Sequence, residues 1–460
     1  MSRACTLSGR ENWTHTIAVL ILAFVFYSLP ISAFAALPPT TSDHATLRIH
    51  GSNTVGARLA PALVRGLLEE QGFQSILIKA GARDNEQLVQ AQSPDGNTII
   101  ITVAAHGSGT GFAALATGEA DLAASSRPIK AAELASLSAL GDLSSANAEH
   151  IIALDGLAII LHPLNPLTSL TTEELAQIFA GEVSDWGELG APPGPIHLYA
   201  RDDKSGTYDT FSELVLSANA KQLAATAKRY ESSEALSDAV SRDKHGIGFI
   251  GLPYIRQAKA IAIGSGDALA MSPSQTQIAT EDYPLSRRLY LYSSPHSQNP
   301  WVQALVDFAQ SARGQAIVQQ TGFIPQTIQT VATELHEDMP ANYRELAQNA
   351  QRLSVNFRFQ EGSATLDNKA KRDLNRLNDF LTPHAKTQGN VVLVGFGDTR
   401  NNPQRTELLS KLRALAVRRE LQRSGVRVRD FIGLGDGLPV ASNQAADGRL
   451  KNRRVEVWVY

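Results

Sequence analysis

Hydrophobic and polar residues alternate with two different periods over most of this chain. Between residues 46 and about 335, short apolar runs typical of strands alternate with stretches in which apolar residues recur every three or four positions, as on one face of a helix. This alternation predicts an α/β architecture. The clearest strand-like runs are residues 76–79, 151–161, 196–200 and 289–292, and the clearest helical patterns are residues 173–179 and 302–311.

A second pattern begins near Leu353 and fills the last part of the chain. Val355, Phe357 and Phe359 alternate with polar residues, which predicts a strand with one buried face. The order that follows is β-α-β-α-β-β, which predicts a separate α+β domain at residues 351–460, and the polar segment 336–350 is interpreted as a connector. The further elements are expected, in chain order, at residues 370–380, 391–394, 406–423, 429–434 and 454–459.

The N-terminus has the features of a secretory signal. Two arginines precede an apolar run at residues 17–29, and residues 33–35 (Ala-Phe-Ala) have the small-x-small form of a cleavage site. A membrane anchor is the alternative, but Pro30 ends the run before it reaches the roughly 20 residues that a bilayer span needs. We therefore expect residues 1–35 to be a signal peptide, and the mature protein to lie in the periplasm without a membrane span.

Cysteine content and charge add two constraints. The only cysteine, Cys5, lies in the expected signal, so the mature chain has no thiol for catalysis or metal binding.

Residues 351–460 carry 20 Lys and Arg against 11 Asp and Glu, a net charge of +9, whereas residues 37–350 carry 20 Lys and Arg against 33 Asp and Glu, a net charge of −13. Such a break favours two domains with different partners. A basic domain can bind nucleic acid, but in an exported protein we expect an anionic wall polymer instead.

Three Gly/Ser/Thr-rich turns each join an apolar strand to a helical pattern. They are residues 50–55, 107–111 and 201–207, and the last of them adds Arg201 to a Ser-Gly-Thr turn. Backbone N–H groups at a helix start, hydroxyls and a guanidinium together suit a small oxyanion. An ordinary tight turn is the alternative interpretation of each segment taken alone.

At these turns the chain resembles a known family. Residues 46 to about 330 are similar to the PstS-like phosphate-binding receptors of bacterial ABC importers, whose most specific motif, Arg-x-Asp-x-Ser-Gly-Thr, is here residues 201–207. The resemblance implies a type II periplasmic binding protein fold in residues 46–335, with two lobes that close around phosphate and a second lobe at roughly residues 130–250. Residues 51–54, 118–129, 168–187 and 246–249 also match the family.

The resemblance also assigns roles to individual residues. Arg201 is the charged anchor of the anion and Asp203 orients its guanidinium, while a surface salt bridge to Asp202 or Asp203 is the alternative role of Arg201. Val55 takes part through its backbone N–H group. The implied phosphate-binding set is Thr54, Val55, Ser108, Thr110, Ser126, Arg201, Ser205, Gly206 and Thr207.

Position 126 departs from some members of that family. They have Asp where Ser126 stands, and that Asp accepts a proton from bound phosphate and so rejects fully ionised sulfate. A serine hydroxyl does not repel sulfate, so weaker discrimination is expected in this chain. The neighbouring Arg127 is either a second cation of the site or an exposed residue of the lobe.

The second domain resembles the OmpA-like peptidoglycan-binding domain. The resemblance implies that Asp398 meets the ammonium group and Arg413 the carboxylate of diaminopimelate in the peptide stem, and a structural ion pair at a helix start is the alternative. One of the two arginines at positions 453 and 454 is expected along the same groove. Residues 399–406 depart from the family pattern. The matching segments are residues 395–398, 409–414, 433–443 and 448–456.

No catalytic motif accompanies these sites. The sequence has no His-Glu-x-x-His, no Gly-x-Ser-x-Gly and no Walker loop. We therefore expect a non-enzymatic binding protein without cofactor or metal, which captures phosphate, is tethered to peptidoglycan and serves an ABC permease. The alternatives are a wall-bound sensor or scavenger without transport, a periplasmic phosphate-ester hydrolase and a purely structural wall protein.

Overall fold

The computed structural model describes residues 45–460 except residues 204, 267, 334, 338, 399–401 and 445. The expected signal peptide, residues 1–35, lies outside the described residues. Among the helices of the described ranges, none combines the length and the apolar composition that a bilayer span requires.

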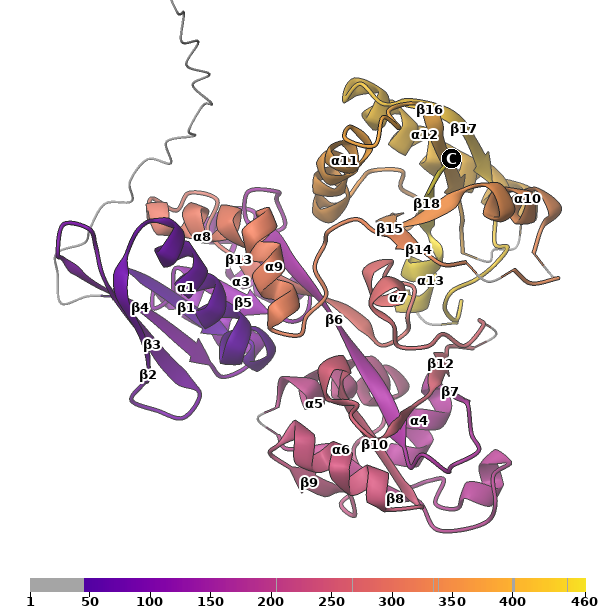
Figure 1. Cartoon of the computed structure of the whole chain (residues 1–460), viewed down its shortest axis with the longest axis horizontal. Coiled ribbons are helices and arrows are strands. Elements are labelled where there is room, and N and C mark those ends of the chain that lie inside the picture. The colour runs from indigo at the N-terminus through magenta and orange to yellow at the C-terminus, as the bar shows by residue number, and fades with distance from the viewer. Residues whose placement is uncertain are drawn as a thin grey trace, which may run out of the picture. The chain divides into compact units, whose positions relative to one another are not determined.

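The first lobe is built on parallel strands with fully buried inward side chains. β1 (Leu47–Gly51) lies between β4 (Thr98–Ala105) and β5 (Leu122–Ser125) and runs parallel to both, so the carboxyl ends of these strands meet at one edge (Figure 1). The lobe also contains η1 (Val55–Leu59), α1 (Ala60–Glu70), β2 (Gln74–Ala80), β3 (Glu86–Gln92), α2 (Ser108–Thr117), α3 (Ala131–Ser136), η2 (Ser138–Leu140), α8 (Pro300–Gln310) and α9 (Ala312–Gln320).

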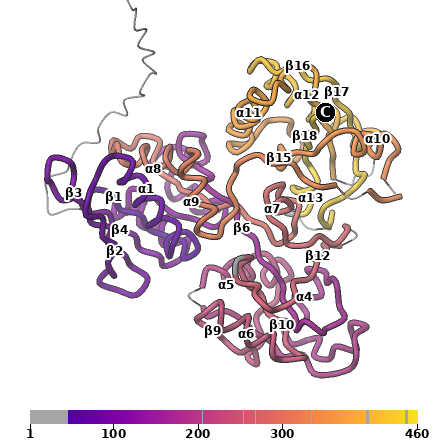
Figure 2. Tube along the Cα trace, viewed as in Figure 1, coloured from indigo at the N-terminus to yellow at the C-terminus, as the bar shows by residue number. Residues whose placement is uncertain are grey.

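Two strands belong to both lobes. β6 (Glu149–Leu161) pairs with β13 (Ser286–Tyr292) along its first part and with β10 (Gly246–Gly251) along its second part, antiparallel in both cases. The chain enters the second lobe along β6 and returns along β13, as the trace in Figure 2 shows. The sheet is therefore continuous through both lobes, in the order β2-β3-β4-β1-β5-β13-β6-β10-β8-β9, with β11 paired to β6.

The second lobe comprises residues 157 to about 285, and the expected range of 130–250 is wrong at both ends. Leu134 and Leu140 pack with Phe112 and Tyr292 in the core of the first lobe, so α3 belongs there. The other elements are β7 (Ser169–Thr171), α4 (Thr172–Phe179), η3 (Trp186–Leu189), β8 (His197–Arg201), α5 (Gly206–Phe211), η4 (Ser212–Leu216), η5 (Ser217–Asn219), β9 (Lys228–Tyr230), α6 (Ser233–Arg242), η6 (Leu252–Tyr254), β11 (Lys259–Ala260), β12 (Ala262–Gly264) and α7 (Gln275–Ala279).

A separate five-stranded sheet, in the order β14-β15-β18-β16-β17, forms the last part of the chain. The expected β-α-β-α-β-β order is confirmed, with one helix, α13, added before the last strand. The elements are β14 (Thr330–Val331), α10 (Ala341–Asn349), β15 (Gln351–Arg358), α11 (Asn368–Leu381), β16 (Gln388–Gly395), α12 (Pro403–Arg423), β17 (Arg427–Gly433), α13 (Ala446–Asn452) and β18 (Arg454–Val459).

The expected connector, residues 336–350, packs on this sheet. It contains α10, whose Tyr343 and Leu346 are buried against Phe396 and Trp458. β14 pairs with β15, so the sheet begins before residue 335. The division at residues 335 and 351 stays a prediction, and Ile328 already packs in the core of this last sheet.

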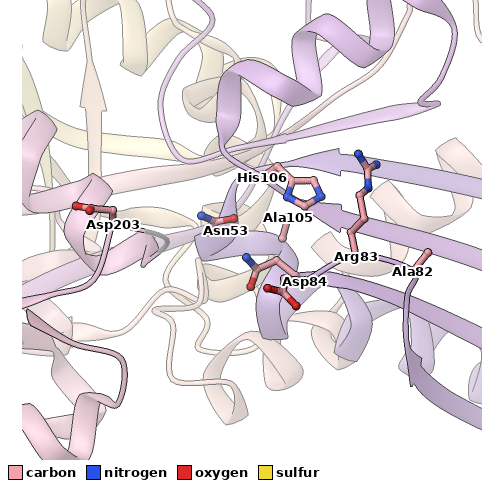
Figure 3. A pocket seen from close by; sticks show the side chains of 8 residues that line it. Asn53, Ala82, Arg83, Asp84, Ala105, His106 and Asp203 are labelled. Carbon is pink, nitrogen blue, oxygen red and sulfur yellow. The ribbon is translucent and has the colours of Figure 1, made fainter.

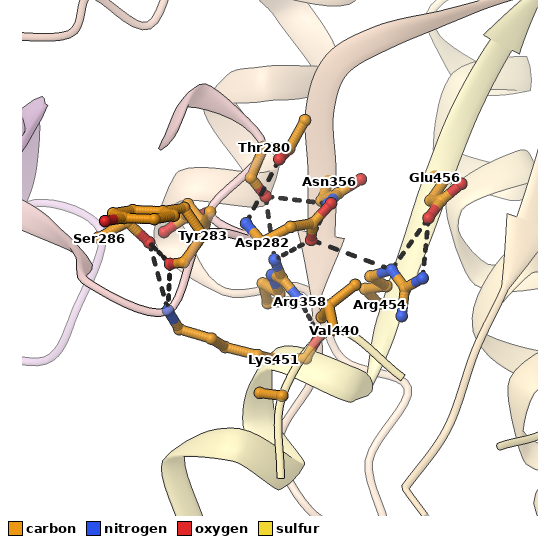
Figure 4. A network of polar contacts seen from close by, with 12 residues as sticks. Thr280, Asp282, Tyr283, Ser286, Asn356, Arg358, Val440, Lys451, Arg454 and Glu456 are labelled. Carbon is orange, nitrogen blue, oxygen red and sulfur yellow. Dashed lines mark hydrogen bonds and ion pairs between the residues drawn. The ribbon is translucent and has the colours of Figure 1, made fainter. Parts of the chain in front are cut away.

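β15 does not have the single buried face that its alternation predicted. Its polar residues are buried as well, because Arg352, Asn356 and Arg358 donate hydrogen bonds to Asp282 at 2.5, 2.9 and 2.8 Å. Asp282 lies in the segment between α7 and β13 and is fully buried. The alternation predicted that the polar face of β15 is exposed to solvent. In the structure this face instead packs against the Asp282 carboxylate (Figure 4).

Candidate functional site

The three Gly/Ser/Thr-rich turns each follow the carboxyl end of a strand. The first follows β1, the second β4 and the third β8. β1 and β4 are parallel neighbours, which brings the first two turns together in the first lobe. Ligand sites of open α/β sheets form at such ends. The third turn belongs to the second lobe, so a ligand held by the first and third turns is held by both lobes.

The first and third turns touch each other. A Cβ atom placed on Gly206 would lie 2.0 Å from Thr54 Oγ1, so only glycine fits at this position. Ser205 precedes it as the N-cap of α5, and its Oγ accepts a hydrogen bond from Thr207 N at 3.2 Å. Val55 follows Thr54 with a fully buried side chain.

The side chains of the second turn bind within the first lobe. Ser108 Oγ accepts a hydrogen bond from Ser126 N at 3.1 Å and lies 3.3 Å from Ser126 Oγ. Thr110 is exposed, and its hydroxyl donates to Gly107 O at 2.8 Å. Arg127 is not exposed as one interpretation had it, because both its terminal nitrogens bind the Glu133 carboxylate.

Arg201 ends β8 with its side chain only 14% exposed. Its Nε and Nη2 donate to the carbonyl oxygens of Tyr230 and Glu231 at 3.1 and 2.8 Å, and its Nη1 donates to Ser233 Oγ. Asp202 Oδ2 lies 3.6 Å from Nη2. These contacts hold the guanidinium in one place on the second lobe.

Asp203 has a different partner from the one expected. In the described part of the chain its carboxylate pairs with Arg229 rather than with Arg201, and its side chain is 84% exposed. Asp202 lies beside the Arg201 guanidinium instead. Alternation along a strand would place Asp203 on the side of Arg201, but β8 ends at Arg201 and Asp203 lies in a turn.

A hollow of about 470 Å³ brings the first and third turns to one place. Its lining includes five residues of the predicted set, Thr54, Arg201, Ser205, Gly206 and Thr207. The predicted residues Val55, Ser108, Thr110 and Ser126 are not part of that lining.

A second hollow, of about 560 Å³, adjoins the first and shares Asn53, Asn85 and Ala105 with it. In Figure 3, Asp203 faces this hollow from the second lobe and His106 faces it from the first. The shared residues make the two hollows parts of one cleft between the lobes.

Two buried charged residues at this cleft were missed by the sequence analysis. Asp155, on β6, lines the first hollow and is 9% exposed, and Arg287, on β13, has a side chain that is 5% exposed. Arg287 Nε donates to Asp155 Oδ2 at 3.3 Å, and Nη2 donates to Thr54 Oγ1 at 2.6 Å and to Gly206 O at 2.9 Å. Arg287 therefore contacts the turns of both lobes. An Asp inside the apolar strand 151–161 was the signal that could have revealed this pair.

The predicted wall site lies at the end of β16. Asp398 and Arg413 are 3% and 1% exposed. Arg453 Nη1 donates to Asp398 Oδ2 at 3.2 Å, so Arg453, one of the two arginines named from the sequence, contacts Asp398. Arg413, on α12, donates to Phe396 O and Ser363 O, both at 3.3 Å.

The segment that departs from the OmpA-like pattern, residues 399–406, is described only from residue 402. Asn402 is the N-cap of α12, with its Oδ1 accepting from Arg405 N at 3.0 Å, and Pro403 is the first helical residue. Both residue types favour a helix start at these positions, so the departure extends α12 by three residues beyond the expected Thr406.

Comparison with known proteins finds a family match for each of the two domains of this chain. The sequence matches the PBP superfamily domain over residues 79–313 and the OmpA family over residues 358–453. It is 30% identical over 275 residues to Protein SphX of Synechococcus elongatus, covering 56% of this chain and 80% of that protein. It is 31% identical over 271 residues to Protein SphX of a Synechocystis species, covering 55% of this chain and 79% of that protein. It is 30% identical over 244 residues to the phosphate-binding protein PstS of Pseudomonas aeruginosa, covering 49% of this chain and 74% of that protein.

The chain belongs to the PBP superfamily. Its first half is a PstS-like receptor and its last part is an OmpA-family domain, so both resemblances found in the sequence are confirmed.

Burial shifts the pKa values of ionisable groups in and near the cleft of this PstS-like receptor. Burial lowers the pKa of the Arg201 guanidinium, with Asp202 opposing the effect, but an arginine keeps its charge under ordinary conditions. Burial raises the pKa of the Asp155 carboxyl group, and Arg287 opposes that change. Burial also raises the pKa of Asp209, on α5, to about 6. Within the described ranges, no three His, Cys, Asp or Glu side chains are grouped so as to hold a metal ion.

Proposed function

We propose that this PstS-like protein captures phosphate, or a similar tetrahedral oxyanion, by closing its two lobes around it. The observation that carries the proposal is the meeting of the first and third turns at one cleft. That cleft is lined by the hydroxyls of Thr54, Ser205 and Thr207 and by the Arg201 guanidinium. Hydroxyl donors and a fixed guanidinium complement the oxygens of a small anion.

In this proposal Arg201 supplies the positive charge and Asp202, rather than Asp203, lies beside it to orient it. The geometry that supports this is the set of contacts from Arg201 to Tyr230, Glu231 and Ser233, which prevent its guanidinium from turning away. Val55, Ser108, Thr110 and Ser126 remain proposed contacts from the first lobe, although they lie outside that lining.

Titration calorimetry of the full chain with phosphate, arsenate, sulfate and molybdate tests the proposal. Arg201→Ala removes the charged donor, and affinity for phosphate should fall by at least about tenfold, since a charged hydrogen bond contributes about 1.5–3 kcal/mol. Arg242→Ala, an exposed arginine of the same lobe, is the matched control and should leave affinity unchanged. Equal affinity of the Arg201 variant and the unaltered protein would place the site elsewhere. The same preparation should not hydrolyse a chromogenic phosphate ester.

We further propose that the OmpA-family domain docks on peptidoglycan through Asp398 and Arg413, and that the receptor delivers phosphate to an ABC permease from the periplasm. The mature chain is then expected to begin near Ala36. N-terminal sequencing of protein recovered from the cell envelope checks this, and an intact Met1 would contradict it.

A further inference from the structure

Phosphate and sulfate have the same shape and differ in a proton. Near neutral pH, phosphate and arsenate keep at least one O–H group, whereas sulfate and selenate have none. A cleft that offers only donors holds both kinds of anion, while an acceptor aimed at the ligand favours the protonated kind and repels the other. In this protein Ser126 occupies the position where some relatives have an acid, and its hydroxyl lies against Ser108 outside the cleft lining.

Asp155 offers an acceptor in the cleft itself. It lies on β6 where that strand passes between the lobes, and it lines the same hollow as Thr54 and Arg201. Its Oδ1 accepts from Gly156 N at 2.9 Å and its Oδ2 accepts from Arg287 Nε at 3.3 Å. A carboxylate has about four lone-pair sites, so two hydrogen bonds leave acceptor capacity on this buried group.

Arg287 sets the direction of the neighbouring hydrogen bonds. Because its Nη2 donates to Thr54 Oγ1 at 2.6 Å, the Thr54 hydroxyl is left to point its own hydrogen elsewhere, as a donor to a ligand. Its Nη1 is buried and has no hydrogen-bond partner among the described residues, and Glu213 Oε2 lies 3.9 Å from it. The guanidinium thus keeps donor capacity beside the cleft and offsets the charge of Asp155.

We propose that Asp155 is the residue that selects the anion in this cleft, accepting the hydrogen bond of a protonated oxyanion, and that Arg287 is the positioning residue behind it. The inference rests on the proposed function. It assigns phosphate and arsenate as preferred ligands over sulfate and selenate, in spite of the serine at position 126.

The unaltered protein already tests this inference. Calorimetry at one neutral pH should give affinities for phosphate and arsenate at least about tenfold higher than those for sulfate and selenate. If none of the four anions binds, the proposed function fails. If all four bind alike, the proposed function survives and the selection by Asp155 is wrong.

Asp155→Asn separates selection from structure. The amide keeps the size of the side chain but removes its negative charge and half of its acceptor capacity, so phosphate should bind more weakly and sulfate no more weakly than before. The ratio of the two affinities should fall by at least about tenfold. A parallel loss for both anions would show that Asp155 only supports the fold, and would overturn the inference.

Two further variants complete the design. Asp209→Asn changes a half-buried carboxylate near the third turn that is absent from the cleft lining, so the ratio should stay as it was. Arg287→Lys keeps the charge but loses the Nε contact that holds Asp155, so the ratio of phosphate to sulfate affinity should fall in the same direction as in Asp155→Asn. An unchanged ratio would overturn the positioning role of Arg287. A changed ratio in Asp209→Asn would overturn the assignment to Asp155. Circular dichroism and thermal unfolding establish that each variant is folded before titration.

Discussion

Asp155 and Asp282 are both buried carboxylates of the receptor half, yet their surroundings shift their pKa values in opposite directions. Burial raises the pKa of Asp155, which has the Arg287 guanidinium at 3.3 Å. Asp282 receives hydrogen bonds from Arg352 and Arg358, and these cations hold its pKa well below the usual range in spite of burial. The difference teaches that the supply of cations, and not burial alone, decides which buried acid is locked into the structure and which keeps acceptor capacity for a ligand.

The Asp282 network also joins the receptor to the OmpA-family domain. Arg454 lies between two acids (Figure 4): its Nε is 4.0 Å from Asp282 and its Nη2 is 2.9 Å from Glu456 Oε1. Glu456 Oε1 also lies 3.3 Å from Arg352 Nη2, so charges of opposite sign alternate. Lys451 Nζ adds hydrogen bonds to the Tyr283 and Pro284 carbonyl oxygens at 2.7 and 2.9 Å. The two domains are therefore held by buried ionic contacts as well as by the chain between them.

The largest expected effect on stability comes from separating the two domains. Fragments of the OmpA-family domain show how stable this domain is in the absence of Asp282. Fragments 326–460 and 351–460 both lack Asp282, but the shorter one also lacks β14 and α10. It loses Met339, Tyr343 and Leu346, which are 9%, 3% and 5% exposed. Burial of each such side chain contributes roughly 1.5–3 kcal/mol, so fragment 351–460 should be less stable by about 4 kcal/mol or more.

Urea unfolding followed by the fluorescence of Trp458 measures that difference, because Trp458 is fully buried and touches Tyr343 of α10. Equal midpoints for the two fragments would restore residue 351 as the start of the domain.

Asp282→Asn and Asp155→Asn compare the two carboxylates directly. Loss of the Asp282 charge leaves Arg352 and Arg358 buried without their common anion, which should lower the free energy of unfolding by about 3–5 kcal/mol. Asp155→Asn should cost clearly less, because its ionised form is disfavoured by burial and Arg287 keeps its contacts to Thr54 and Gly206. Chemical denaturation of the full chain checks the order of the two variants. The reverse order would refute the distinction between a locked and an available acid.

Acid unfolding should distinguish Asp282 from Asp155, because their pKa values are shifted in opposite directions and their contributions to stability therefore depend on pH with opposite sign. The pKa of Asp282 is lower in the folded chain than the value of about 3.9 for a free Asp, so its contribution to stability is present above that value and is lost as the pH falls below it. Asp155, with a raised pKa, contributes most at low pH and loses its contribution as the pH rises through that pKa. Glu281, whose pKa is lowered to about 2 by Arg288 and Lys369, acts in the same direction as Asp282.

Stability below about pH 4 should therefore depend less on pH in Asp282→Asn than in the unaltered chain, without becoming flat. Asp155→Asn should keep the full acid slope. Unfolding midpoints at a series of acid pH values measure both slopes, and an unchanged slope in Asp282→Asn would contradict the assigned pKa.

The sequence predicted the elements and the two families well, and predicted the site in part. Arg201 and the turns that meet at the cleft came from a local motif, which a sequence can carry. Asp155 and Arg287 lie 132 positions apart and meet only because β6 and β13 pair. Arg287 also has Arg288 beside it, and only the fold determines that Arg288 turns instead to Glu281.

The buried polar face of β15 was missed for the same reason. Alternation along a strand tells which residues share a face, but not what covers that face. Arg352, Asn356 and Arg358 share a face that local pattern assigns to water, and Asp282, 70 or more positions earlier, covers it. The packing of the predicted connector was missed likewise, since α10 is polar in sequence and only the fold shows that Tyr343 and Leu346 meet the sheet.

The smallest expected effect concerns Asp398, a buried acid whose Oδ2 accepts from Arg453 Nη1 at 3.2 Å. If Asp398 meets the peptide stem as proposed, Asp398→Asn should weaken co-sedimentation of the full chain with purified peptidoglycan by about tenfold, the loss expected for one charge-assisted contact. Arg413→Ala should weaken sedimentation similarly, while phosphate titration stays unchanged in both variants because the cleft is on the other domain. Asp430→Asn and Arg423→Ala, at exposed positions of β17 and α12, are the matched controls. Sedimentation equal to that of the unaltered chain would make Asp398 a structural acid like Asp282, and the OmpA-family match would then extend to the fold but not to wall binding through this pair.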